Sequence, residues 1–214
     1  MATASWQAQV KVSGAAVAMT GEACTSLGGG QYQVTNAAKR ILDPSASVVV
    51  KDAGSPVSVA LWSVDRLFGV VTFSGYTPSG AVTIDASYVP VGSVGESKAI
   101  NIKASAELVD VSAFESSARK RQTALLDCEG SLERLALPLD DLDGVTAGTQ
   151  SLDGWMKSGT PRLVDVLFAT GARFRAWVLF NSYEVQSEAA GVVTVKVNFS
   201  GAAQGAGAAF GWGT

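Results

Sequence analysis

One serine and one lysine in this chain have a spacing that serves catalysis in other proteins. Ser117 and Lys120 match the S-x-x-K pattern of serine–lysine acyl enzymes, in which two side chains one helical turn apart share a proton. Lys120 stands between Arg119 and Arg121, and no neighbouring segment indicates an oxyanion hole. A basic, solvated surface is therefore the better interpretation, and we assign no catalytic role to the pair.

Two further segments carry residue types that bind ions or nucleotides in other proteins. The aspartates of LDDLDG (139–144) offer oxygen ligands, but they lack the D-x-D-x-D-G order and the distant glutamate of a calcium loop. The glycines of 205–211 miss the dinucleotide-binding spacing, and no helix is expected after them. We expect a polar turn in the first segment and a flexible tail in the second.

The chain contains no histidine, which removes the commonest general base near neutral pH. This excludes Ser-His-Asp and Cys-His arrangements, and it excludes histidine ligands for zinc. Cys24 and Cys128 are far apart and form no C-x-x-C pair, so we expect two reduced thiols. The sequence therefore predicts a protein that is not an enzyme, with no catalytic, metal-binding or cofactor-binding residue and no cofactor.

The composition is that of a chain with a packed core. Hydrophobic residues make up 47% and charged residues 16% of its 214 positions, a balance that favours folding over disorder. No apolar run approaches the about 20 residues that cross a bilayer, and the segment MATASWQAQV lacks the pattern of a signal peptide. The net charge of −3 differs from the basic excess of proteins that grip DNA phosphates. We expect a soluble protein without a membrane anchor.

Hydrophobic and polar residues alternate along several segments, which is the pattern of strands with one buried and one wetter face. The longest such run places five residues on one face: Ile100, Ile102, Ala104, Ala106 and Leu108. Similar runs lie at 8–12, 82–88, 164–168, 174–180 and 193–200. Because this alternation is typical of antiparallel sheets, we predict a mainly β fold, either a β-barrel or a β-sandwich.

Turn signals rich in glycine, proline and aspartate separate these runs. They lie at 28–30, 43–45, 52–56, 77–80 and 169–173. The last of them, ATGAR, stands between two strand runs and predicts a hairpin. No linker divides the chain and no repeat occurs in it. We therefore expect a single domain over 1–214, with 202–214 as a Gly/Ala-rich C-terminal extension.

One basic segment interrupts the strand pattern. It begins with an S-x-x-E capping box at 112–115, and apolar residues from Phe114 to Leu125 recur on neighbouring turns. We therefore predict a flanking α-helix over about 113–126, with its apolar stripe packed on the sheet and its basic face outward. A short second helix is expected over about 150–157, ended by Gly159.

The order of these patterns resembles that of a known protein family. The segment AELVDVSAFESSARKRQTALLDCEGSLE (106–133) has a strand, a turn at Asp110–Ser112, the predicted helix, and a strand with a Gly-Ser step at 130–131. This order resembles that of the tail tube (major tail) proteins of tailed bacteriophages. Three further segments are similar to parts of that family: QYQVTNAAKRILDPSASVVV (31–50), FGVVTFSG (68–75) and VKVNFSGAA (195–203). The end after Gly201 aligns with nothing in it.

The resemblance implies a structural virion protein with a tail-tube-like β fold. Six copies would close into a ring, their sheets would join into one inner barrel, and stacked rings would form the conduit for phage DNA. It implies partners beyond the chain itself: the tape-measure protein in the lumen, a tail terminator, and tail-tip or baseplate proteins. DNA would pass without specific binding, and the protein would reside in the virion tail after assembly in the host cytoplasm.

The residues expected at subunit contacts lie in the predicted helix, at its start and near the end of the chain. They are Asp110, Ser112, Phe114, Glu115, Arg119, Lys120, Arg121, Phe210 and Trp212. The alternative is a monomeric β-sandwich that binds sugars or surfaces. That function needs a patch of exposed aromatic residues or a calcium cage, and the five tryptophans are dispersed along the sequence.

Overall fold

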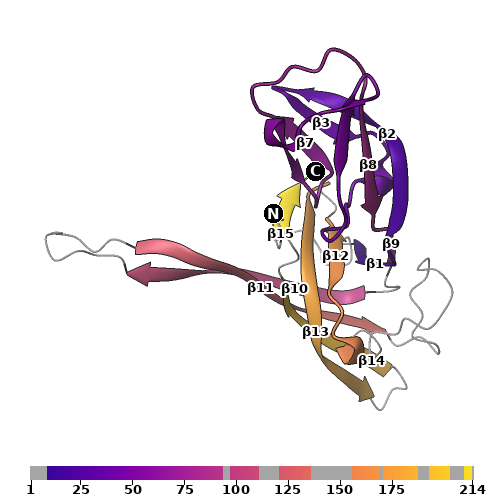
Figure 1. Cartoon of the computed structure of the whole chain (residues 1–214). Coiled ribbons are helices and arrows are strands. Elements are labelled where there is room, and N and C mark those ends of the chain that lie inside the picture. Colours follow the sequence, from indigo (N-terminus) through magenta and orange to yellow (C-terminus); the bar gives the residue numbers. More distant parts are fainter. Residues whose placement is uncertain are drawn as a thin grey trace, which may run out of the picture.

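Two antiparallel sheets make up most of the structure, a computed structural model that describes residues 9–93, 97–110, 121–135, 156–168, 171–187, 193–202 and 210–213. In Figure 1 the two sheets lie one above the other, and a long two-stranded ribbon projects from the lower sheet. The predicted mainly β class is confirmed. The single domain over 1–214 stays a prediction.

The first sheet has eight strands in the order β10-β11-β14-β13-β12-β1-β9, with β15 also paired to β13. Its strands are β1 (Gln9–Ser13), β9 (Val91–Ser93), β10 (Ser97–Asp110), β11 (Arg121–Leu135), β12 (Arg162–Leu167), β13 (Arg173–Ser187), β14 (Val193–Gly201) and β15 (Phe210–Gly213). The register on β13 runs from Val193 to Gly201 of β14 and continues from Phe210 to Gly213 of β15. The last strand therefore extends the line of β14.

The second sheet has seven strands in the order β5-β4-β8-β2-β3-β7-β6. Its strands are β2 (Val17–Gly28), β3 (Gln31–Val34), β4 (Val49–Asp52), β5 (Ser55–Pro56), β6 (Trp62–Asp65), β7 (Val70–Phe73) and β8 (Val82–Tyr88), with two 3-10 turns, η2 (Ala37–Lys39) and η3 (Val59–Leu61). The turn between β2 and β3 is the predicted glycine run, in which Gly28, Gly29 and Gly30 all have positive φ, a conformation that costs glycine little.

The second sheet is an insertion between two neighbouring strands of the first. β1 ends at Ser13 and β9 begins at Val91, and these two residues are partners in the β1–β9 register. The amide of Gly14 donates to the carbonyl of Pro90 at 2.8 Å. The chain thus leaves the first sheet and returns to it at one place, after building the whole second sheet.

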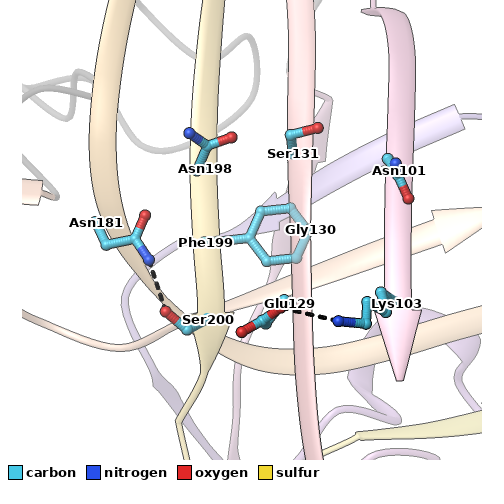
Figure 2. Close-up of a pocket in the computed structure, with 9 residues that line it drawn as sticks. All are labelled: Asn101, Lys103, Glu129, Gly130, Ser131, Asn181, Asn198, Phe199 and Ser200. Carbon is cyan, nitrogen blue, oxygen red and sulfur yellow. Dashed lines mark hydrogen bonds and ion pairs between the residues drawn. The ribbon is translucent and has the colours of Figure 1, made fainter. Parts of the chain in front are cut away.

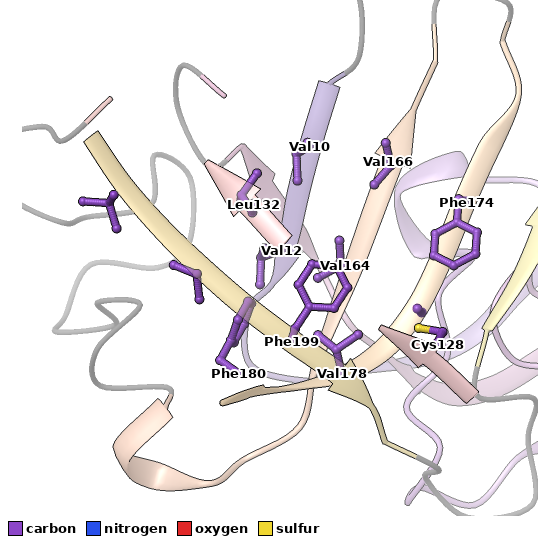
Figure 3. Packing of buried hydrophobic residues seen from close by; sticks show 13 residues of the cluster. Val10, Val12, Cys128, Leu132, Val164, Val166, Phe174, Val178, Phe180 and Phe199 are labelled. Carbon is purple, nitrogen blue, oxygen red and sulfur yellow. The ribbon is translucent and has the colours of Figure 1, made fainter. Parts of the chain in front are cut away.

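The core of the first sheet is formed by the apolar face that the alternation predicted. Figure 3 shows the buried valines and phenylalanines of β1, β12, β13 and β14 pointing toward Cys128 and Leu132 of β11. Val12, Val166, Val178 and Val197 are fully shielded from solvent. Each such side chain contributes about 1.5–3 kcal/mol when removed from water, so this face holds the sheet together.

A separate cluster joins the two sheets. Leu163 of β12 and Trp177 of β13 are register partners that face the inserted sheet, where they pack with Leu67, Phe68 and other residues. Their neighbours in β12 and β13 point to the opposite face, into the core of the first sheet. These two strands are therefore buried on both faces.

The helix predicted over about 113–126 is wrong for its second half. Residues 121–126 belong to β11, where Arg121, Gln122 and Thr123 pair with Asp110, Val109 and Leu108 of β10. Continuing an existing ladder gives these residues hydrogen-bond partners on a neighbouring strand, and such tertiary context overrides a weak local preference for helix. Residues 111–120, with the whole capping box, lie outside the described residues.

The second helix and the hairpin were placed correctly where the structure describes them. Residues 156–158 are helical and Gly159 follows with φ 59°, while 150–155 lie outside the described residues. The ATGAR segment joins β12 to β13, with Leu167 opposite Arg173. The amide of Phe168 donates to the carbonyl of Ala172 at 2.9 Å across this turn.

Candidate functional site

The β10–β11 ribbon is the feature of the fold that a single copy leaves most exposed. β14 pairs with β11 only from Glu129 onward, so toward Arg121 the ribbon has two strands and, among the described residues, no third. Figure 1 shows this part reaching away from both sheets, with the Asp110–Arg121 pair toward its far end. Isolated two-stranded ribbons are marginally stable in water, and no third described strand supports this one.

One side of the ribbon continues the apolar face of the first sheet. Cys128 is buried, whereas Leu126, two residues further out on the same face, is 64% exposed. Its partner Ala106 and the neighbouring Ala104 on β10 are also exposed. The predicted buried face of β10 is therefore wrong at Ala104 and Ala106, because no strand or helix among the described residues covers these two side chains.

The opposite face of β10, β11, β14 and β13 is polar and made of small side chains. Figure 2 shows a shallow hollow on it, lined by Asn101, Lys103, Glu129, Gly130, Ser131, Asn181, Asn198, Phe199 and Ser200. Amide and hydroxyl groups join the strands: Asn181 Nδ2 donates to Ser200 Oγ at 2.7 Å, and Asn198 Nδ2 donates to Ser182 Oγ at 2.7 Å. These hydrogen bonds link polar side chains of β13 and β14 across the sheet.

Acidic side chains outnumber basic side chains on this polar face. Strand alternation places five carboxylates on it, from Glu107, Asp127, Glu129, Glu133 and Glu184, and two ammonium groups, from Lys103 and Lys196. Both lysines stand beside carboxylates. Lys103 Nζ lies 3.7 Å from Glu129 Oε2, and Lys196 is the register partner of Glu133 and Glu184. No cation of this described face is left without an acidic neighbour.

Gly130 allows neighbouring strands and the Phe199 ring to pack closely at the centre of this sheet. A Cβ at this position would meet the carbonyl oxygen of Asn101 at 2.3 Å and the ring of Phe199 at 2.4 Å. The Phe199 ring therefore lies directly over the glycine, and any side chain there would push β10 and β14 away. The Gly-Ser step quoted from the sequence thus has a packing role in β11.

Burial also determines the state of the two thiols. Desolvation, followed by the charges of Asp127 and Glu129, raises the pKa of Cys128 to about 11, and desolvation raises that of Cys24 to about 11. Both are free cysteines, as predicted. Such thiols stay protonated near neutral pH and are poor nucleophiles.

Of the nine predicted contact residues, the structure describes four: Asp110, Arg121, Phe210 and Trp212. Asp110 and Arg121 are register partners toward the far end of the β10–β11 ribbon. Five others lie outside the described residues: Ser112, Phe114, Glu115, Arg119 and Lys120. Their role at a subunit contact stays a prediction.

Phe210 and Trp212 lie in β15 and pack within their own chain. The Phe210 ring is 6.1 Å from that of Phe174, and Trp212 lies 5.1 Å from Phe174 and 5.8 Å from Phe168 between ring centroids. The flexible tail expected over 205–211 is therefore wrong for Phe210 and Gly211, which lie in β15. Trp212 is still 63% exposed, so one face of its ring is free for a contact.

The described residues hold no group of three or more acidic, cysteine or histidine side chains that could bind a metal ion. Ser117, Lys120 and the LDDLDG aspartates lie outside this part of the chain. Among the described residues no helix is both long and apolar enough to cross a membrane. Of the described tryptophans, Trp62 is half-buried and Trp177 is buried, which leaves Trp212 as the exposed one.

Sequence reasoning missed a buried charge network between the sheets. Arg175 and Asp165 are register partners on β13 and β12, each 2% exposed, with Arg175 Nε 3.2 Å from Asp165 Oδ1. Arg175 Nη1 also donates to the carbonyl of Leu67 in the inserted sheet. The signal available in the sequence was one charged residue inside each of two apolar runs, Asp165 in 162–167 and Arg175 in 173–180.

Comparison with known proteins gives likenesses among solved structures alone. No family model matches the chain, and no curated protein matches it. The chain is similar to one in the tail of an empty gene transfer agent particle, with 16% identity and a TM-score of 0.43 over 58% of this chain and 87% of that chain. It is also similar to one in the virion of a native gene transfer agent particle, with 16% identity and a TM-score of 0.42 over 58% and 89%. These likenesses assign no role to any residue of this chain.

Proposed function

We propose that this chain is a structural virion protein whose copies form stacked rings of six, the tail tube through which DNA is delivered. The observation that carries this proposal is a four-stranded piece of sheet, β10-β11-β14-β13, whose two outer strands have no further strand beside them over much of their described length. Among the described residues β10 pairs with β11 alone, and β12 covers β13 only from Arg173 to Val178. Among the described residues no strand pairs with β13 from Leu179 to Ser187 on the side where β12 ends.

The directions of these two edges suit a closed ring. Every pairing in the piece is antiparallel, so β10 and β13 run in opposite directions. A rotated copy that places its β13 beside β10 would continue the antiparallel order without a break. This is a head-to-tail contact, which closes into a ring at a suitable rotation, and closure removes edges that otherwise invite uncontrolled pairing.

In such a ring the polar face would line the channel. Its hydroxyl and amide groups are small and mutually bonded, and its carboxylates outnumber its lysines. Each neutralised phosphate adds salt-dependent attraction for DNA, and a ring repeats every charge in each copy. An acidic wall with paired lysines would let DNA pass without holding it.

The exposed ribbon would make the contact between copies. Its apolar side, with Ala104, Ala106 and Leu126, would lie on a neighbouring copy, since these three side chains are exposed among the described residues of their own chain. Partners outside the ring remain those that the family resemblance implies: a tape-measure protein, a terminator and tip proteins. The protein would then have no catalytic role and would reside in the virion tail after assembly in the host cytoplasm.

A monomeric binding module is less well supported. That function needs a platform of exposed aromatic rings, and of the described tryptophans only Trp212 is exposed. The polar face offers a shallow hollow without an aromatic ring on its surface, since the Phe199 side chain is 2% exposed and packs in the core.

The size of the purified protein in solution tests the proposal. Light scattering after size exclusion should give a mass of six chains or more, rising with concentration, and negative-stain images should show rings or tubes. A mass of 22.0 kDa at all concentrations up to the solubility limit, with no polymer in the images, would refute it.

A further inference from the structure

A cavity of ≈ 370 Å³ lies where the inserted sheet meets the first sheet. The first sheet contributes Lys11 of β1, Asp165 of β12, and Arg173 and Arg175 of β13 to its lining. The inserted sheet contributes Tyr88 of β8, and η2 adds two alanines. The cavity thus has one charged wall and one wall of mainly apolar side chains.

The charged wall carries three cations and one carboxylate. Lys11, Asp165 and Arg175 are register partners in a row across β1, β12 and β13. Asp165 Oδ1 lies 3.2 Å from Arg175 Nε and 3.5 Å from Arg173 Nε. A single carboxylate is therefore shared by two guanidinium groups, and the remaining positive charge has no counter-ion on this wall.

Arg175 has partners on both sheets, whereas Arg173 has an ion pair with Asp165 alone and Lys11 has no described partner. Besides Asp165, Arg175 contacts the carbonyl of Leu67 and lies over the Phe68 ring at 5.0 Å. Within the described part of the chain Lys11 makes no ion pair or hydrogen bond, and the buried Arg173 Nε has no hydrogen-bond partner. A buried donor without a partner is costly, so the cavity lacks an acceptor at this position.

The surroundings of Arg175 also contain further positive charge. Burial is the main cause that lowers the pKa of Arg175, and the positive charges of Arg173 and Arg40 lower it further, against the opposite effect of Asp165. Arg175 therefore lies in a desolvated site where Asp165 is the main counter-charge and two further arginines add positive charge. An anion placed among Lys11, Arg173 and Arg175 would offset this charge.

We propose that this cavity binds a phosphate-class oxyanion, held by Lys11 and the Arg173 guanidinium. The fork of N–H donors on arginine matches the oxygens of phosphate, and lysine adds a point charge. Because Tyr88 and η2 form the other wall, a bound anion would also fasten the inserted sheet to the first sheet. The phosphate could be free or part of a nucleic acid backbone, which share this chemistry.

The test is phosphate binding to the intact chain, measured by equilibrium dialysis and by thermal melting at constant ionic strength with chloride as the matched anion. Saturable phosphate binding and a melting temperature that rises with phosphate but not with chloride are expected. Lys11→Met should weaken the affinity about tenfold or more, the effect of losing one charge-assisted hydrogen bond. Lys103→Met, which removes a lysine that is 71% exposed on the polar face, should leave it unchanged.

Three results would overturn the proposal: no saturable binding by the wild type, equal affinity in Lys11→Met, or an equal rise in melting temperature with chloride. Arg173→Met is the second variant and should also weaken binding, so that the outcome does not depend on one substitution folding well. A short single-stranded oligonucleotide that competes with phosphate would identify nucleic acid backbone as the source. An oligonucleotide that does not compete would identify free phosphate.

Discussion

Replacing Leu126 with alanine should weaken assembly while leaving the single chain as stable as before. The Leu126 side chain is 64% exposed in the ribbon, and complete burial of a leucine contributes about 1.5–3 kcal/mol. Covering the exposed part in a subunit contact would thus contribute about 1–2 kcal/mol per copy. Since about 1.4 kcal/mol changes an equilibrium tenfold, the critical concentration for polymer should rise about 5- to 30-fold.

A sedimentation assay over a concentration series measures this effect, and urea unfolding of the unassembled chain measures the stability. The unfolding free energy should change by less than about 0.5 kcal/mol, as for other exposed positions. Val59→Ala is the matched control, because Val59 is an aliphatic residue of the inserted sheet that is 72% exposed. If Leu126→Ala and Val59→Ala both polymerise at the wild-type concentration, the apolar side of the ribbon is not a contact surface.

Three further predictions concern the channel, acid stability and the last strand. Asn198→Lys should give tubes that retain DNA on a filter at low salt and release it at high salt; tubes that retain none would place the polar face away from the channel. Hydrogen bonds, the largest from the amide of Ser79, lower the pKa of Asp52, so its contribution to stability is present above the ordinary carboxyl pKa and is lost as the pH falls through the lowered value. Asp52→Asn should therefore be less stable than the wild type at pH 7 in urea unfolding, with the difference shrinking below pH ~4, and a constant difference would contradict this role. Phe174→Ala should cost about 3–5 kcal/mol, against about 1 kcal/mol for the exposed Trp212→Ala, and similar losses in calorimetry would show that the β15 packing is misassigned.

The strand faces could be predicted from the sequence because a period of two fixes which side chains share a side. Val195, Val197 and Phe199 alternate with Lys196 and polar residues, and all three are buried. The same rule failed at Ala104 and Ala106, since alternation indicates a shared face without saying whether anything covers it. Whether a neighbouring copy does so depends on contacts outside one chain.

The strand over 121–126 and the inserted sheet could not be predicted for different reasons. The first depends on pairing with β10, and the sequence of the segment alone has apolar spacing that also suits a helix. The second depends on Ser13 and Val91 being partners, although 77 residues separate them, and nothing local indicates that contact. The Arg175–Asp165 pair was missed because charges inside an apolar run reveal their partners only after the strands are paired.

Cryo-electron microscopy of the assembled protein tests the central claim most directly. We predict a six-fold tube in which β10 of each copy lies antiparallel to β13 of the next, with Ser131 and Asn198 facing the channel and Leu126 covered by a neighbour. Particles that stay monomeric at every concentration, or an assembly in which the β10 and β13 edges face solvent, would contradict the claim.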